Sequence, residues 1–163
     1  MSSVTISTVM QHSSEEERKA AYRESGKAIA VALIGFTLQA VSVLSTSDES
    51  GTASTVGFTA FKERSVATFQ ELTFISAAGI WAESLVFPHE QKSDMESIFG
   101  RLNLDRARID KAELKFGLDY LADNYRTAVL AIAQRLLQQK IINGIECGQI
   151  ILAHRPLPGT KRV

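Results

Sequence analysis

The sequence predicts a mainly helical α+β domain with one small β-hairpin or sheet, and three observations support this. Long segments in both halves of the chain space their apolar residues by three and four positions, as one face of a helix requires. A short region between them alternates apolar and polar residues around a turn-rich connector, which is typical of two paired strands. With 163 residues, 45% of them hydrophobic, the chain is long enough for one domain with its own core.

The first predicted helix runs from about Glu15 to Ile34. Ser13 or Ser14 can cap it, and glutamates fill its first turn, where the helix dipole favours negative charge. We expect it to end at Gly35, because glycine readily adopts the left-handed conformation of a helix C-terminus. Residues 1–12 are predicted to form a flexible N-terminal tail.

The hairpin and two further helices follow. The segments LQAVSVLST and VGFTAF are predicted as strands around a polar, glycine-containing connector. Helical spacing returns from Arg64 to Val86, and Pro88 ends that helix because a proline ring cannot continue it. A shorter helix is predicted in QKSDMESIFGRLN, with Asp94 near its beginning.

The last third of the chain is predicted to be helical as well. One long segment from Asp105 to Lys140 is expected to break near Gly117. Asn143 and Gly144 form a turn before a final helix in IECGQIILA. The predicted domain therefore covers residues 13–154, and residues 155–163 form a basic C-terminal tail.

Charge and composition argue against several classes of function. Lysine plus arginine equals aspartate plus glutamate at 18 each, so no basic field predicts nucleic-acid binding. The most apolar run, Ala28 to Ala40, is interrupted by polar residues and shorter than the ~20 residues that span a bilayer. No apolar signal segment is visible, and the single cysteine, Cys147, cannot form an internal disulfide. We therefore expect a soluble, cytoplasmic protein.

Five pieces of the chain follow one another in the order of a known family. They are AYRESGKAIAVALIG, the strand pair LQAVSVLS and GFTAF, AAGIWAESLVF, SDMESI, and AVLAIAQRLLQQKIINGIECGQII. Together they resemble the protease domain of FtsH-type ATP-dependent zinc metalloproteases over residues 17–152. The first is similar to that family's A-Y-H-E-x-G-H-A-L-V helix, and the third to its G-G-R-A-A-E-E-L-x-F helix. The resemblance implies a helical metalloprotease-like domain with one small β-hairpin or sheet.

The resemblance places a zinc site on residues that do not suit zinc. The family's two histidine ligands fall on Arg23 and Lys27, its general base on Glu24, and its aspartate ligand on Asp94. Arginine has no lone pair to offer, and lysine would first have to lose its proton. Since a catalytic zinc needs three protein ligands, we expect no metal here and a vestigial base at Glu24.

The same substitutions predict an ion-pair cluster. Arg23 and Lys27 lie one turn apart on one helix face, and loss of zinc would leave Asp94 close to Glu24 without a cation. We expect both cations to pair with Asp94, with Glu24 near the edge of the cluster. The alternative is a solvated helix face, with Asp94 serving only as a carboxylate at a helix start.

These residues lead to the hypothesis of a catalytically inactive peptidase-like domain, a pseudoprotease, that acts in protein binding or self-assembly. The family's motor is absent, since no G-x-x-x-x-G-K-[ST] loop is present to bind ATP. The resemblance implies peptides, further copies of the chain or an active homologous protease as partners, and the strand GFTAF could pair with an extended peptide.

The alternative function is an ATP-independent metallopeptidase or other hydrolase with non-standard metal ligands. Glu24 and Asp94 would then contact zinc and activate water. A variant of this alternative adds His89, five residues before Asp94, as a further ligand.

Overall fold

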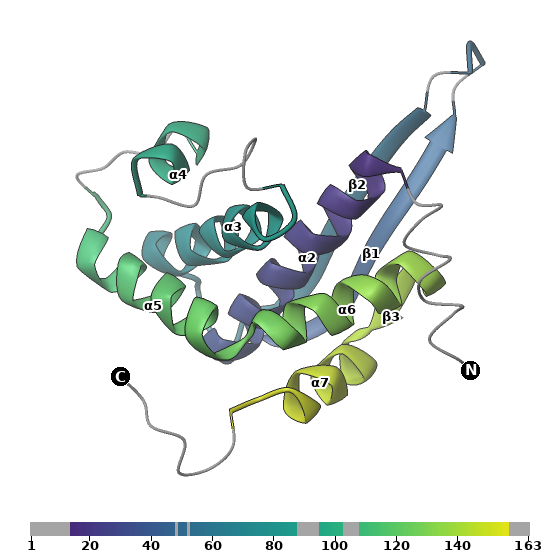
Figure 1. Cartoon of the computed structure of the whole chain (residues 1–163). Coiled ribbons are helices and arrows are strands. Elements are labelled where there is room, and N and C mark those ends of the chain that lie inside the picture. The colour runs from purple at the N-terminus through teal and green to yellow at the C-terminus, as the bar shows by residue number, and fades with distance from the viewer. Residues whose placement is uncertain (1–13, 48, 52, 88–94, 103–107, 157–163) are drawn as a thin grey trace.

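The computed structural model describes residues 14–47, 49–51, 53–87, 95–102 and 108–156. Within this part of the chain the structure is mainly helical with one small antiparallel sheet, which confirms the predicted fold class. The helix α2 (Glu15–Ile34) lies at the centre, with the sheet on one side of it and other helices on the other sides (Figure 1). Asp94, His89 and the predicted N-terminal tail lie outside the described residues.

Both ends of α2 agree with the prediction. The side chain of Ser14 caps the helix by accepting a hydrogen bond of 3.1 Å from the backbone N–H of Glu17. Gly35 ends it in the left-handed conformation, with φ of 92°. No helix within the described ranges is long and apolar enough to cross a membrane.

The sheet contains one strand that the sequence did not reveal. β1 (Thr37–Ser47) and β2 (Ala53–Lys62) form the predicted antiparallel hairpin, and β3 (Ile141–Asn143) pairs with the other side of β1. The sequence predicted a turn at Asn143 and Gly144 and assigned no element to Ile141 and Ile142, so β3 was not predicted. Three residues are too few to show alternation, and their pairing depends on the fold.

Two helix boundaries also differ from the prediction. α3 (Phe69–Ser84) begins five residues after Arg64, because Thr68 and Glu71 form a capping box at its N-terminus. The expected break near Gly117 is wrong, since α5 (Lys111–Asn124) continues through it. The break falls instead at Tyr125, before α6 (Arg126–Gln139). The remaining helices are α4 (Met95–Leu102) and α7 (Gly144–Ala153).

The packing of α2 against α3 is unusually close and positions the candidate site. A Cβ atom at Gly26 would lie 2.4 Å from the backbone oxygen of Ala78 and 2.6 Å from the Cβ of Ala82. Only glycine therefore allows the two helices to approach in this way. Small residues on both helices bring the charged side chains beside Gly26 within reach of α3.

Candidate functional site

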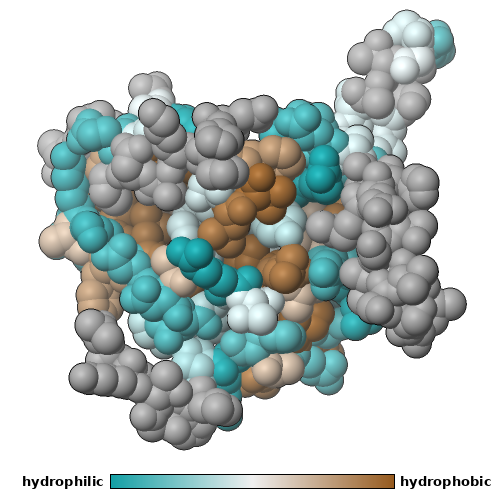
Figure 2. Space-filling model, in the orientation of Figure 1, coloured by the Kyte–Doolittle hydropathy of each residue, from teal (hydrophilic) through white to brown (hydrophobic). Residues whose placement is uncertain are grey.

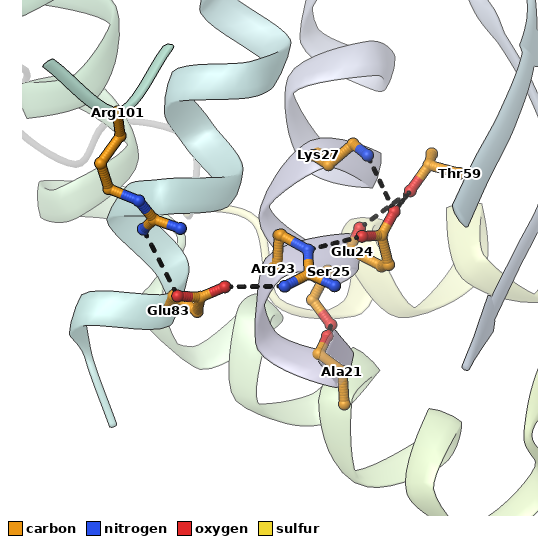
Figure 3. A network of polar contacts seen from close by, with 8 residues as sticks. All are labelled: Ala21, Arg23, Glu24, Ser25, Lys27, Thr59, Glu83 and Arg101. Carbon is orange, nitrogen blue, oxygen red and sulfur yellow. Dashed lines mark hydrogen bonds and ion pairs between the residues drawn. The ribbon is translucent and has the colours of Figure 1, made fainter. Parts of the chain in front are cut away.

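Two fully buried glutamates mark the candidate site, one on each of the closely packed helices. Glu24 on α2 and Glu83 on α3 have side chains that are only 1% and 2% exposed. An ionised carboxylate is costly to bury unless cations or hydrogen-bond donors surround it. Figure 3 shows that the neighbouring cations come from α2 and α4.

Five alternating charges form what we call the ion-pair row: Lys27, Glu24, Arg23, Glu83 and Arg101. At its centre the Arg23 guanidinium donates from Nε to Glu24 Oε2 at 3.1 Å and from Nη1 to Glu83 Oε1 at 2.9 Å. Lys27 Nζ lies 3.0 Å from Glu24 Oε1, and Arg101 Nη1 lies 3.4 Å from Glu83 Oε2. Each buried carboxylate therefore has a cation on both of its oxygens.

The strand β2 completes the surroundings of Glu24. The hydroxyl of Thr59 lies 3.1 Å from Glu24 Oε1 and 3.3 Å from the Glu24 backbone oxygen, and it can donate to either. A Cβ at Gly57 would lie 2.8 Å from Glu24 Cγ, so only a residue without a side chain fits there. The GFT segment of β2 is thus shaped to cover Glu24.

Three of the four predicted site residues lie together in the structure, and the fourth, Asp94, lies outside the described residues. Arg23, Glu24 and Lys27 lie together, with Glu24 between the two cations rather than near an edge. The side chains of Arg23 and Lys27 are about a third exposed, so this helix face is not simply a solvated one. The pairing with Asp94 stays a prediction, because that residue lies outside the described ranges.

Sequence reasoning missed Glu83 as a member of the site, although a signal was available. Glu83 follows a run of small and apolar residues in a helix, and Trp81 and Ala82 directly before it are buried. A single acidic residue within such a run indicates a buried charge that needs a partner. The partner itself could not be read from the sequence, because Arg23 lies 60 positions away.

The donor set of the ion-pair row does not fit zinc. Both oxygens of Glu24 already accept contacts from cations, and neither protonated Arg23 nor protonated Lys27 can donate a lone pair. Among the residues that the structure describes, no group of three or more His, Cys, Asp or Glu side chains could hold a metal ion.

Two other candidate nucleophiles are not placed for catalysis. Cys147 on α7 is fully buried, and desolvation raises the pKa of its thiol to about 12, so it is protonated at neutral pH. The Ser25 hydroxyl is also buried and donates to the backbone oxygen of Ala21 at 2.6 Å. Neither side chain has an adjacent base among these contacts.

The hairpin presents a second feature, an uncharged edge strand with apolar side chains. Within the described residues β2 pairs with β1 alone, and its residues 53–61 carry no charge. One face of the sheet, here called the ribbon face, exposes four large apolar side chains: Leu44, Val56, Phe58 and Ile141. The far end of the hairpin is pale to hydrophilic (Figure 2), since serine and threonine predominate there.

A comparison of the chain with protein-family models finds no match, and a comparison with curated proteins finds none either. The resemblance to FtsH-type protease domains therefore stays a prediction.

Proposed function

We propose that this chain is a non-catalytic, FtsH-type peptidase-like domain that binds extended peptide segments. The observation that carries the non-catalytic part is the state of Glu24. This residue stands where the resemblance puts the general base, yet it is fully buried and contacts Lys27, Arg23 and Thr59. A general base must reach the water or substrate from which it takes a proton, and this carboxylate faces protein groups.

The binding part of the proposal is supported by β2. An edge strand exposes a row of backbone N–H and C=O groups that can pair with another extended segment. Natural proteins usually protect such an edge with charge or proline, and β2 has neither before Lys62. Its partner could be a foreign peptide or a segment of another copy, because backbone pairing is the same for both.

The non-catalytic part is tested by a cleavage assay and by elemental analysis of the purified full chain. We expect no stoichiometric metal and no hydrolysis of fluorogenic casein, with or without added zinc. Hydrolysis that is present in the wild type and lost in Glu24→Gln would contradict the proposal and favour the metallopeptidase alternative. The glutamine is nearly isosteric, so loss of activity would report the carboxylate rather than a change of shape.

The binding part is tested with a library of extended peptides and fluorescence anisotropy. We expect Val56→Lys to weaken binding, because a lysine on an edge strand disfavours pairing with a further strand. Leu44→Lys is the matched control, since Leu44 lies directly opposite Val56 on the inner strand and on the same face. Equal weakening by both variants would assign binding to the ribbon face rather than to the edge, and no binding of any peptide would contradict the proposal.

A further inference from the structure

A small pocket lies beside the ion-pair row, between α2, α3 and α4. Its volume is about 220 Å³, and it is lined by Arg23, Lys27, Ser76, Ile80, Arg101 and Leu102. A water molecule occupies ~30 Å³ of liquid, so the pocket has room for a small polar group. Among the described residues that line the pocket, every charged residue is a cation.

The two carboxylates of the row are behind these cations rather than in the pocket. The side chains of Glu24 and Glu83 are 1% and 2% exposed, whereas those of the three cations are 28% to 39% exposed. Within the described residues, a molecule that enters the pocket therefore meets the cations before the carboxylates. The row holds three cations and two carboxylates, so these five residues together carry one net positive charge.

The central cation is already fixed in position. Glu24 and Glu83 hold Arg23 from two sides, so little side-chain freedom is lost when a ligand binds. A guanidinium has five N–H donors. Within the described residues the contacts of Arg23 use Nε and Nη1, and its Nη2 has no protein acceptor. Within the same residues, the only ion pair of Lys27 Nζ is with Glu24.

We infer that this pocket binds an oxyanion of the carboxylate or phosphate type. Such groups offer several acceptor oxygens to arginine and lysine donors, and charge-assisted hydrogen bonds are stronger than neutral ones. The hydroxyl of Ser76, an exposed residue on α3, supplies a further donor in the lining.

The oxyanion has two sources that the structure allows. One is an acidic side chain of a peptide bound to β2, whose Thr59 contacts Glu24, the ion-pair partner of Lys27 in the pocket wall. This source rests on the proposed function. The other is a free anion such as inorganic phosphate, which does not depend on peptide binding.

The test uses the full chain labelled with ¹⁵N and follows the arginine Nε–H signals by NMR. One arm titrates inorganic phosphate against chloride at constant ionic strength. The other compares extended peptides that carry one aspartate with the same peptides carrying asparagine. We expect phosphate or the aspartate peptides to shift the Arg23 signal, and we expect Ser76→Asp to weaken that binding ~10-fold or more by placing a like charge in the pocket.

Ser76→Asp is preferred to a change in the row itself, because removing Arg23 would leave buried carboxylates and could prevent folding. Thr127→Asp, on the exposed part of the first turn of α6, is the matched control and should bind as the wild type does. Phosphate binding lost in Ser76→Asp supports a free anion, and aspartate-dependent peptide binding lost there supports a peptide source.

The inference is overturned if neither phosphate nor aspartate produces binding beyond the chloride and asparagine references, or if Ser76→Asp binds as tightly as the wild type. Equal binding of aspartate and asparagine peptides, together with no phosphate binding, would overturn the inference and leave the proposed function intact. Phosphate binding without any peptide binding would support the pocket and count against the proposed function.

Discussion

The α2–α3 interface and the hairpin distribute polarity in opposite ways. At the interface two carboxylates are almost completely buried among helices. On the hairpin Val56 and Phe58 are 58% and 41% exposed, although both are apolar. Soluble proteins usually place charge outside and large apolar side chains inside. The interface is unusual because it buries charge, and the hairpin is unusual because it exposes large apolar side chains.

Under the proposed function, this difference separates a region that the fold requires from a surface that binds peptides. A buried charge that loses its partner costs several kcal/mol, so the ion-pair row must stay complete for the domain to fold. Exposed apolar side chains contribute little to folding, and a contiguous patch of them is typical of a surface that binds a partner. Substitutions in the row should therefore affect stability first, whereas substitutions of the exposed apolar side chains on the ribbon face should affect binding with little change in stability.

The largest effect is expected for Arg23→Ala, which removes the cation shared by both buried glutamates. The free energy of unfolding should fall by ~3–5 kcal/mol, the range measured when one partner of a buried ion pair is removed. Urea unfolding followed by circular dichroism measures it. Lys115→Ala is the control, because its pair with Asp119 is exposed and should contribute no more than ~1 kcal/mol. If Arg23→Ala lost no more than the ~1 kcal/mol expected of Lys115→Ala, the ion-pair row would not be required for folding, and the contrast with the hairpin would not hold.

The next effect concerns the close approach that makes the row possible. In Gly26→Ala the new Cβ would meet the backbone of Ala78, so α2 and α3 must separate at a cost of ~1–3 kcal/mol. Alanine favours a helix over glycine by ~1 kcal/mol. A fall in the free energy of unfolding therefore indicates the clash with α3, and a rise indicates helix propensity alone. Gly148→Ala on α7, where the added atom meets nothing within 4 Å, should be stabilising. A stabilising Gly26→Ala would contradict the close packing.

The sequence alone predicted much of this fold because its signals are local. The cap at Ser14, the three glutamates after it and the glycine at position 35 define α2 without any tertiary information. The alternation in β1 and β2 likewise depends on neighbouring residues. By contrast, β3 depends on pairing with the edge of β1, which is far away in the sequence. The start of α3 is marked by a local signal that the apolar pattern does not contain, the capping box of Thr68 and Glu71.

The site could be predicted only in part, for a similar reason. Helical spacing is enough to place Arg23 and Lys27 on one face. Which carboxylates face them is a tertiary property: Glu83 and Arg101 come from other helices, and Thr59 comes from a strand. The family resemblance predicted Asp94 as the partner carboxylate. The apolar run around Glu83 indicates that this residue is buried, but its pairing with Arg23 is evident only in the folded chain.

A smaller effect is expected at an ion pair outside the row, Lys140 with Glu17 at 2.9 Å. The hydrogen bond from Lys140 lowers the pKa of the Glu17 carboxyl below its ordinary value of 4.5. The pair therefore stabilises the fold fully above that ordinary value, and this contribution disappears as the pH falls through the lowered pKa of the folded chain. Near neutral pH, Lys140→Gln should cost ~0.2–1 kcal/mol.

An NMR titration of the Glu17 carboxyl in the wild type and in Lys140→Gln checks this prediction. The pKa should rise towards the ordinary value in Lys140→Gln, and the two proteins should become equally stable at a pH well below it. A difference in stability that persists in strong acid would show that Lys140 acts through something other than its charge. The difference in stability between the wild type and Lys140→Gln gives the contribution of a partly exposed ion pair, which can be compared with that of the buried ion-pair row.

The smallest effect on stability is expected for Val56→Thr on the ribbon face. Threonine keeps the β-branched shape, and Val56 is 58% exposed, so the free energy of unfolding should change by less than ~0.5 kcal/mol. Peptide affinity is a separate measurement: it should fall if the apolar face contacts the bound segment, and it should stay unchanged if the backbone edge alone binds. A large loss of stability would show that Val56 belongs to the core rather than to a binding surface, and the contrast between the hairpin and the ion-pair row would then no longer hold.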